Sequence, residues 1–267
     1  MPVRPRYATL DALSLPPSPS PATQMARPLA PAVRPQSIAP LGDAAVIVDF
    51  SDTVDVAVNA GIQRLARAVR RKKVAWLVDV VPGIGSLALH FDAALLGEVD
   101  AARATEALIS ECLARGLNPI DDPVRRIEVP ICYDEAFGLD LRELSELLKM
   151  PIPEIGLRHA ACNFSVLMMG FAPGHPYLGG LDQKLAVPRR ATPRAIVPGG
   201  SVGLANGQCV IYPYSLPGGW NIIGRTPLKL FDSTGGEPSI MEPGDAVRFI
   251  AIDRAEFDRI VIAEGTS

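Results

Sequence analysis

The chain has 267 residues, of which 48% are hydrophobic and 21% charged, so it can bury the core of one large or two modest domains. Its formal net charge is only -3, which gives no electrostatic reason for binding nucleic acid or an anionic membrane. No apolar run is long enough to span a bilayer. The four cysteines form no CxxC pair, so we expect no zinc ribbon and, for a cytoplasmic protein, no structural disulfide.

Residues 1–40 are rich in proline, serine and alanine, and they lack the apolar periodicity of a folded segment. This composition predicts a disordered or polyproline-like tail. The segment holds several arginines and a single acid, Asp11, which is also compatible with a targeting peptide. It has no compact apolar core of the secretory kind, so a dispensable tail remains the preferred interpretation.

Residues 41–132 predict a small α/β domain. We expect strands at 45–50, 74–81, 87–91 and 126–131, with one helix after Ser51 and Asp52 and a second from about Asp100. The order βαββαβ is that of the ferredoxin-like, split-βαβ plan.

Residues 133–267 have a different sequence pattern, with short runs separated by glycine and proline, and this pattern predicts a second domain. Short helices are expected at 140–148 and 153–159. Short β-type runs follow, punctuated by glycine and proline, at 164–169, 202–205, 209–212, 221–223, 228–231 and 246–252. Many short strands with turn signals indicate a barrel or a sandwich. The fold class is therefore α+β.

Two familiar motifs fail on their context, and two others are absent. Gly83-Ile84-Gly85-Ser86-Leu87-Ala88 fits GxGxxA, but an alternating strand follows it instead of the helix that a dinucleotide needs. Gly199-Gly200-Ser201-Val202-Gly203 fits GxSxG, but no histidine follows His175 to complete a hydrolase triad. The sequence has neither a P-loop nor an HExxH pair, so we expect no metal site.

Two segments are dense in residues that suit a binding site. In 170–181, prolines and glycines fix the backbone while aromatic residues line it, as in a rigid pocket rim. In 188–194, Arg189, Arg190 and Arg194 could hold a carboxylate or phosphate, or the segment could be a solvated loop that pairs with local acids. Trp220 could cover a ligand or plug the barrel. His159 could be structural or a general acid or base.

A long series of these residues stands in one order: Gly170, Phe171, Pro173, Gly174, Tyr177, Leu178, Pro188, Arg189, Arg190, Pro193, Arg194, Pro198, Gly200, Ser201, Val202, Gln208, Tyr212, Pro213, Pro217, Gly218, Gly219, Trp220, Ile223, Gly224, Arg225, Thr226 and Pro227. The series resembles the allophanate hydrolase subunit 1 family. That family includes the B subunit of bacterial 5-oxoprolinase, the sporulation-kinase inhibitor KipI and a carboxyltransferase segment of urea amidolyase. The likeness extends from about Leu41 to Phe257.

The resemblance implies a small α/β domain followed by a cyclophilin-like β-barrel. For the oxoprolinase type, the nearest match, it implies the B subunit of a multi-subunit, ATP-hydrolysing 5-oxoprolinase that opens 5-oxo-L-proline to L-glutamate. Partner A and C subunits are implied, the C subunit being the closest, with ATP and Mg used by the assembled complex. The expected catalytic residues are His159, Arg190 and Gln208. The expected substrate-binding residues are Pro173, Gly174, Tyr177, Arg189, Arg194, Tyr212, Gly219, Trp220 and Arg225.

The sequence departs from the family pattern at His175, at Asn206 and at Leu216, which all fall on the expected pocket. These departures keep two alternatives open. One is a carboxyltransferase-like or allophanate-hydrolase-like subunit that acts on another small amide or urea derivative. The other is a histidine kinase inhibitor of the KipI type, which needs a surface and no catalytic residues.

Overall fold

The computed structural model describes residues 33–117, 124–234, 236 and 238–265. These residues divide into two compact units, one ending at Val124 and the other running from Arg125 onward. We call them the N-terminal unit and the barrel unit. No helix in the described ranges is long and apolar enough to cross a membrane.

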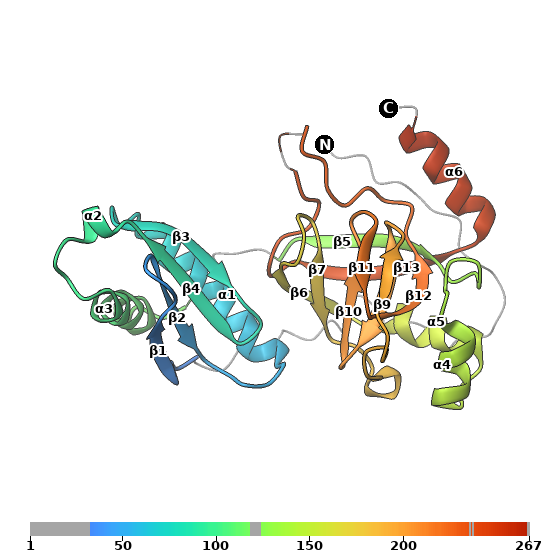
Figure 1. Cartoon of the computed structure of the whole chain (residues 1–267), viewed down its shortest axis with the longest axis horizontal. Helices are drawn as coiled ribbons and strands as arrows, with labels where there is room; N and C mark the ends of the chain where they lie inside the picture. The colour runs from blue at the N-terminus through green and yellow to red at the C-terminus, as the bar shows by residue number, and fades with distance from the viewer. Residues whose placement is uncertain (1–32, 118–123, 235, 237, 266–267) are drawn as a thin grey trace. The chain divides into compact units, whose positions relative to one another are not determined.

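The N-terminal unit is one antiparallel sheet packed against helices (Figure 1). Its elements are β1 Ser37–Pro40, β2 Ala45–Asp49, α1 Val56–Arg71, β3 Leu77–Pro82, β4 Ser86–Phe91, α2 Ala93–Leu96 and α3 Ala101–Ala114. The strand order is β1-β2-β4-β3. Alternate residues of the strands, such as Val48, Leu87 and Leu89, join apolar residues of α1 and α3 in one core because successive strand side chains face opposite ways.

Helix α1 begins later than the sequence predicts. Its N-cap is Asp55, whose carboxylate accepts hydrogen bonds from the backbone N–H groups of Ala57 and Val58. Ser51 instead bonds to Thr53 two residues on. The predicted cap at Ser51 and Asp52 is therefore wrong, whereas the predicted start of α3 after Asp100 is confirmed.

The barrel unit contains a closed seven-stranded barrel in the order β10-β7-β6-β13-β5-β12-β9 (Figure 1). Its elements are β5 Arg126–Cys132, α4 Leu141–Leu148, α5 Ile152–Ala161, β6 Phe164–Met169, β7 Pro176–Gly179, η3 Gln183–Leu185, β8 Arg194–Val197, β9 Ser201–Ala205, β10 Gln208–Ile211, β11 Leu216–Gly218, β12 Asn221–Arg225, β13 Ala246–Ile252 and α6 Arg254–Gly265. The predicted α+β class with a β-barrel is thus confirmed.

Strand β5 corrects the predicted domain boundary. The sequence predicts it as the fourth strand of the first sheet, but it pairs in parallel with β13, from Arg126 opposite Ala246 to Cys132 opposite Ile252. The fourth strand of the N-terminal sheet is β1, which pairs with β2 and lies in the segment predicted as tail. The division therefore falls after Val124, and not at 132, and the predicted tail of 1–40 ends too late. Residues 1–32 of that tail lie outside the described residues.

The remaining strand predictions differ in three places. The run 228–231 forms no strand; its only ladder contact in the described chain is a bridge between Phe231 and Ser239. Strand β7 lies inside the segment predicted as a pocket rim. Strands β8 and β11, which the sequence does not predict, pair as a separate two-stranded ribbon.

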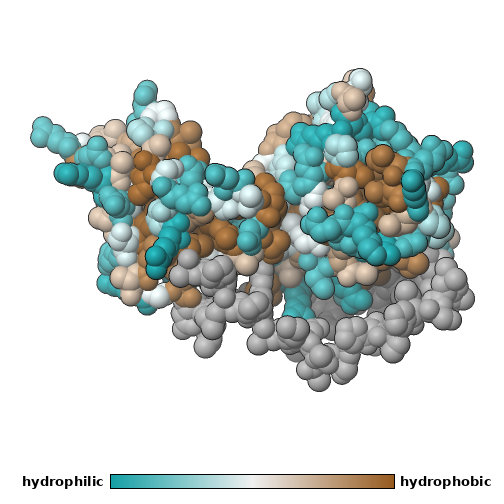
Figure 2. Space-filling view, turned by 90° about the horizontal axis from the view of Figure 1, so that it is seen from below, coloured by the Kyte–Doolittle hydropathy of each residue, from teal (hydrophilic) through white to brown (hydrophobic). Residues whose placement is uncertain are grey.

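A small second core lies on the outside of the barrel and positions the candidate site. It contains Val197 of β8 together with residues of the barrel wall: Ala205, Val210, Tyr212, Trp220 and Ile222. Residues of β9 and β10 alternate between this core and the main one, so Leu204 and Cys209 face the barrel interior. Elsewhere both units expose apolar surface, and Figure 2 shows hydrophobic patches among hydrophilic residues on the visible face of each.

Candidate functional site

Four rings gather on the outer face of the barrel. Tyr177 of β7 lies 6.0 Å from Trp220, measured between ring centroids, and His175 lies 5.1 Å from Tyr177 and 5.3 Å from Tyr212. We call His175, Tyr177, Tyr212 and Trp220 the aromatic cluster. Three of the four were predicted as substrate-binding residues, and the fold brings them together from three different strands or strand ends.

Tyr212 is the fixed centre of the aromatic cluster. It is 1% exposed, and its hydroxyl lies where a side chain at position 218 would stand, so Gly218 leaves it room. Burial raises the pKa of Tyr212 to about 12, although a hydrogen bond from the Trp220 backbone N–H works in the opposite direction. The Tyr212 side chain is therefore neutral at physiological pH. It contributes an apolar ring with one polar atom, its hydroxyl oxygen.

Arg189 supplies a positive charge at the edge of the aromatic cluster. Its guanidinium carbon lies 5.1 Å from the centroid of the Trp220 ring, a cation–π geometry. The side chain is exposed, and within the described residues no carboxylate pairs with it. Its charge also acts on the hydroxyls of Tyr177 and Tyr212, lowering the pKa that burial raises. Arg189 is thus placed to bind an anion beside the rings.

Arg190 and Arg194 both form ion pairs with carboxylates of the protein. Both bind the carboxylate of Asp140, which is 1% exposed; Arg194 lies 2.6 Å from it, and Arg190 also lies 2.8 Å from Glu143. The Glu143 carboxylate is the main cause that raises the pKa of Arg190. The predicted roles of Arg190 in catalysis and Arg194 in substrate binding find no support in this geometry, which matches the alternative of a basic loop paired with local acids.

Two hydrogen bonds, together with the ion pairs to Asp140, hold the segment that carries Arg189. The Asn221 side-chain amide donates to the Pro188 carbonyl at 2.8 Å, and the Arg190 backbone N–H donates to the carbonyl of Gly219 at 2.8 Å. Gly219 thus serves as a backbone anchor beside Trp220. Asp140 and Asn221 were missed as site residues because their partners lie far away in the sequence.

The turn before β7 closes one side of the aromatic cluster. Gly174 has a φ of +77°, and a side chain there would lie 2.6 Å from the Cβ of Phe231, so only glycine fits. Pro173 is exposed at the tip of the turn, whereas His175 is 1% exposed and points its ring among Phe171, Tyr177 and Tyr212. Pro173 and Gly174 therefore shape the turn beside the aromatic cluster through the backbone, and their role in substrate binding stays a prediction.

His159 lies away from the aromatic cluster, in the barrel core. It has no exposed surface; its Nδ1 is hydrogen-bonded to the Tyr133 hydroxyl at 2.7 Å, and its Nε2 lies 3.4 Å from the Cys209 sulfur. Burial lowers the pKa of His159 to about 3. This position argues against the predicted catalytic role, because no substrate reaches the imidazole in this conformation.

Gln208 and Arg225 lie at different places on the barrel wall. Gln208 is 7% exposed. It lies two residues before Val210 on the same strand, so its side chain is on the outer face of the barrel. Its Nε2 has no hydrogen-bond partner within the described residues. Its catalytic role stays a prediction. Arg225 lies at the far end of β12 from Trp220, where it donates to the Gly199 carbonyl at 2.7 Å and stacks on Phe137. Arg225 is thus separate from the aromatic cluster.

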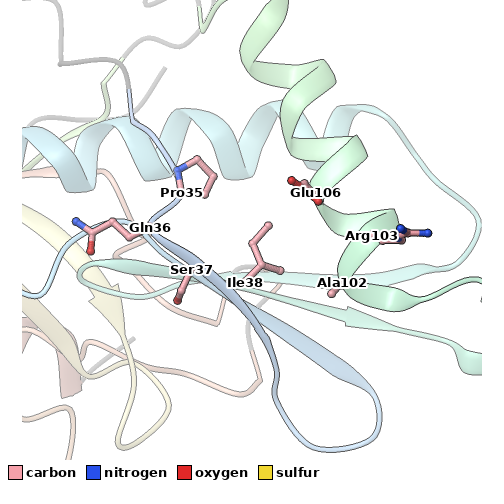
Figure 3. A pocket seen from close by; sticks show the side chains of 7 residues that line it. All are labelled: Pro35, Gln36, Ser37, Ile38, Ala102, Arg103 and Glu106. Carbon is pink, nitrogen blue, oxygen red and sulfur yellow. The ribbon is translucent and has the colours of Figure 1, made fainter.

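The N-terminal unit has an open depression of about 350 Å³ between β1 and the first turns of α3 (Figure 3). It is lined by Pro35, Gln36, Ser37, Ile38, Ala102, Arg103 and Glu106. None of these was predicted as a site residue, and its two charged side chains have opposite signs. Across the described ranges, no group of three or more histidine, cysteine or acidic side chains is arranged for a metal ion.

Comparison with known proteins gives a consistent family. Residues 36–241 match the family described as carboxyltransferase domain, subdomain C and D. The chain is 32% identical to the 5-oxoprolinase B subunit of Bacillus subtilis (strain 168) over 223 residues, covering 81% of this chain and 93% of that protein. It is 34% identical to the 5-oxoprolinase B subunit of Escherichia coli O157:H7 over 210 residues, covering 79% of this chain and 93% of that protein.

Among solved structures, the chain resembles TTHA0988 with a TM-score of 0.67 and 30% sequence identity over 79% of its length. It spans 40% of the length of TTHA0988. The same fold therefore occurs there as part of a longer chain.

Proposed function

Because the chain belongs to the family of carboxyltransferase domains, subdomains C and D, we propose that it is the B subunit of a multi-subunit, ATP-dependent 5-oxoprolinase. The assembled cytoplasmic enzyme opens 5-oxo-L-proline to L-glutamate. The observation that carries the proposal is the identity of 32% and 34% to two proteins named as the B subunit of 5-oxoprolinase, over 93% of the length of each.

In this proposal the chain works with partner A and C subunits, with the C subunit the closest, and has no turnover alone. An unactivated lactam resists hydrolysis, so its carbonyl oxygen needs activation, which phosphoryl transfer from ATP with Mg²⁺ supplies in the complete complex. The contribution of this chain is to bind and orient the substrate.

The aromatic cluster and Arg189 support a site for a small, flat, anionic substrate. The half-buried Tyr177 ring lies beside Trp220, and Arg189, whose guanidinium stands over the Trp220 ring, offers two parallel N–H groups to the single carboxylate of the substrate. Because the Asp140 and Asn221 contacts hold the Arg189 segment, the charge stays over the Trp220 ring before substrate arrives. A preorganised charge binds an anion at a smaller entropic cost.

The test is glutamate release from 5-oxoproline with ATP, by this chain alone and by the chain co-purified with the A and C subunits. Turnover by the complete set only is expected, and Arg189→Ala in that set should raise KM for 5-oxoproline about tenfold or more, as loss of a charged hydrogen bond does. Arg115→Ala, a change at an exposed arginine of the N-terminal unit, is the matched control and should leave KM unchanged. A stable complete complex that releases no glutamate would rule out the oxoprolinase function.

A further inference from the structure

Within the described residues, His175 brings to the aromatic cluster a buried polar atom that has no hydrogen-bond partner. Its ring is 1% exposed, and its Nδ1 has no hydrogen-bond partner within the part of the chain that the structure describes. Buried polar atoms are nearly always hydrogen-bonded, because leaving one unpaired costs free energy. An unpaired imidazole nitrogen inside the proposed site therefore calls for a ligand group that pairs with it.

The backbone holds His175 in this position. Its carbonyl accepts a hydrogen bond from the Gly170 N–H at 3.2 Å, and its N–H donates to the Ala172 carbonyl at 3.1 Å. Gly174 fixes the turn before it, and β7 begins directly after it. These contacts fix the backbone of His175, from which the imidazole extends into the aromatic cluster.

The surroundings of His175 are aromatic. The ring contacts Phe171 of its own turn, Tyr177 of β7 and Tyr212 after β10, and Arg189 is the charge that acts on both tyrosines. Burial lowers the pKa of His175 to about 4, although a contact of the ring with the backbone of His175 itself, which does not meet hydrogen-bond geometry, works in the opposite direction. The imidazole is therefore neutral at pH 7. The Nδ1 of a neutral imidazole can donate to an amide carbonyl or accept from an amide N–H, depending on the tautomer, and it offers no charge to a carboxylate.

Phe171 is the exposed neighbour of the His175 ring. Its ring lies 5.4 Å from the imidazole at 74°, and the side chain is 63% exposed. Its backbone φ is 70°, a left-handed conformation that a residue with a side chain adopts at a cost. A ligand reaches the buried imidazole only if a neighbouring side chain moves, and Phe171 is the exposed one among the rings that contact it.

We propose that His175 is a specificity-determining residue that hydrogen-bonds the amide group of the substrate, while Arg189 binds its carboxylate. The ligand class is a small molecule with one amide or ureido group and one carboxylate. This inference rests on the proposed function for the location of the site, but it does not require the amide to be a lactam.

The experiment is calorimetric titration of the complete chain with two matched pairs of probes. 5-Oxoproline and ureidoacetate each carry an amide group and a carboxylate. Cyclopentanecarboxylate and 4-methylpentanoate keep the carboxylate and the approximate shape but lack the amide. The wild type should bind at least one amide probe about tenfold more tightly than its partner, the order of magnitude for one buried hydrogen bond.

His175→Phe should abolish that preference while leaving the affinity for cyclopentanecarboxylate within about twofold, because only the bond to the amide is lost. His175→Asn, which keeps a side-chain amide, should retain part of the preference and guards against a folding defect. Arg189→Gln should weaken all bound probes by a similar factor and keep the preference. His90→Phe, the same change at a histidine of the N-terminal unit, should behave as the wild type.

A wild-type preference that survives in both His175 variants would overturn the proposal, and so would a wild type that shows no preference for either amide probe. A His175-dependent preference for ureidoacetate without one for 5-oxoproline would support the role of His175. It would at the same time contradict the 5-oxoprolinase function, so the two proposals fail separately.

Discussion

Asp140 joins three segments of the barrel unit through one buried carboxylate. It accepts hydrogen bonds from Arg190, from Arg194 and from the Ile222 backbone N–H at 2.7 Å, while its own N–H donates to the Ile222 carbonyl. The arginines keep partial contact with solvent, whereas the carboxylate has almost none. The carboxylate therefore governs where the Arg189 segment lies relative to β12.

Asp140→Asn should destabilise the barrel unit by about 3 kcal/mol, because it leaves two guanidiniums without their buried partner. Urea unfolding followed by circular dichroism measures this loss. Glu143→Gln removes the exposed partner of Arg190 and is the matched control, with an expected loss below about 1 kcal/mol. Equal effects of the two substitutions would contradict the assigned importance of the buried carboxylate.

The neutral imidazole of His159 should make stability depend on pH. In the unfolded chain a histidine titrates near its ordinary pKa of 6.5, whereas burial holds the pKa of His159 at about 3. Protons therefore bind preferentially to the unfolded state, and stability is full above pH 6.5 and is lost as pH falls towards 3. Between pH 7.5 and 5.0 the contribution of His159 is a loss of about 2 kcal/mol.

Urea unfolding at pH 7.5, 6.5, 5.5 and 5.0 checks this dependence, and His159→Asn should reduce its slope. The slope, and not the stability at any one pH, is the relevant quantity, because the substitution also removes the contacts to Tyr133 and Cys209. An identical slope in the variant would show that His159 is protonated in the folded state.

Residue types alone predicted part of the site. Tyr177, Tyr212, Trp220 and Arg189 could be chosen because rings and guanidiniums recur along the segments that become the outer barrel wall. Arg190 and Arg194 have the same chemistry as Arg189, and only the fold distinguishes them by bringing Asp140 to within hydrogen-bond reach. The choice between a ligand-binding arginine and a structural one depends on a contact across about fifty residues, which no local pattern contains.

At the scale of elements, β9 and β12 approach so closely that they exclude a side chain between them. A Cβ at Gly203 of β9 would lie 2.7 Å from the Cβ of Trp220, at the start of β12. Gly203→Ala should displace Trp220 and cost about 1 to 3 kcal/mol by overpacking. Gly236→Ala, at a position with open space around it, is the control and should be neutral.

Thermal unfolding and tryptophan fluorescence of the two variants test this packing. Each variant is best made in a Trp76→Phe background so that Trp220 is the only fluorophore of its kind. An unchanged emission maximum together with an unchanged melting temperature in Gly203→Ala would mean that the strands separate easily. The Trp220 wall would then not be rigid.

The elements that could be predicted are those whose pattern is local. The boundaries of β6 and β13 agree with the prediction because both are mainly apolar runs, each with a single polar residue, Ser165 or Arg248. Strand β5 has the same appearance, but its assignment to a sheet depends on β13, whose residues lie 120 positions further along the chain. Strand β1 was hidden by Pro35 and Pro40 at or near its two ends, since proline is normally a sign against a strand.

At the scale of the molecule, the boundary after Val124 decides which fragments can fold. Strand β5 lies between β13 and β12 in the barrel order, so without it the barrel cannot close and two strands expose unpaired edges. Arg125 adds a bond to the Asp245 carboxylate at 2.8 Å, next to the start of β13. A fragment must therefore include both Arg125 and β5 to contain the whole barrel.

Residues 124–267 should accordingly fold alone, with a cooperative thermal transition and well-dispersed amide signals in NMR spectra. Residues 133–267, the fragment that the sequence-based boundary suggests, should aggregate or give collapsed spectra, because the open edges of β12 and β13 can pair with other copies. Circular dichroism melting and heteronuclear NMR of the two purified fragments compare them directly. A cooperative transition at a similar temperature in the shorter fragment would mean that β5 is dispensable, and that the barrel closes by a pairing different from the one described.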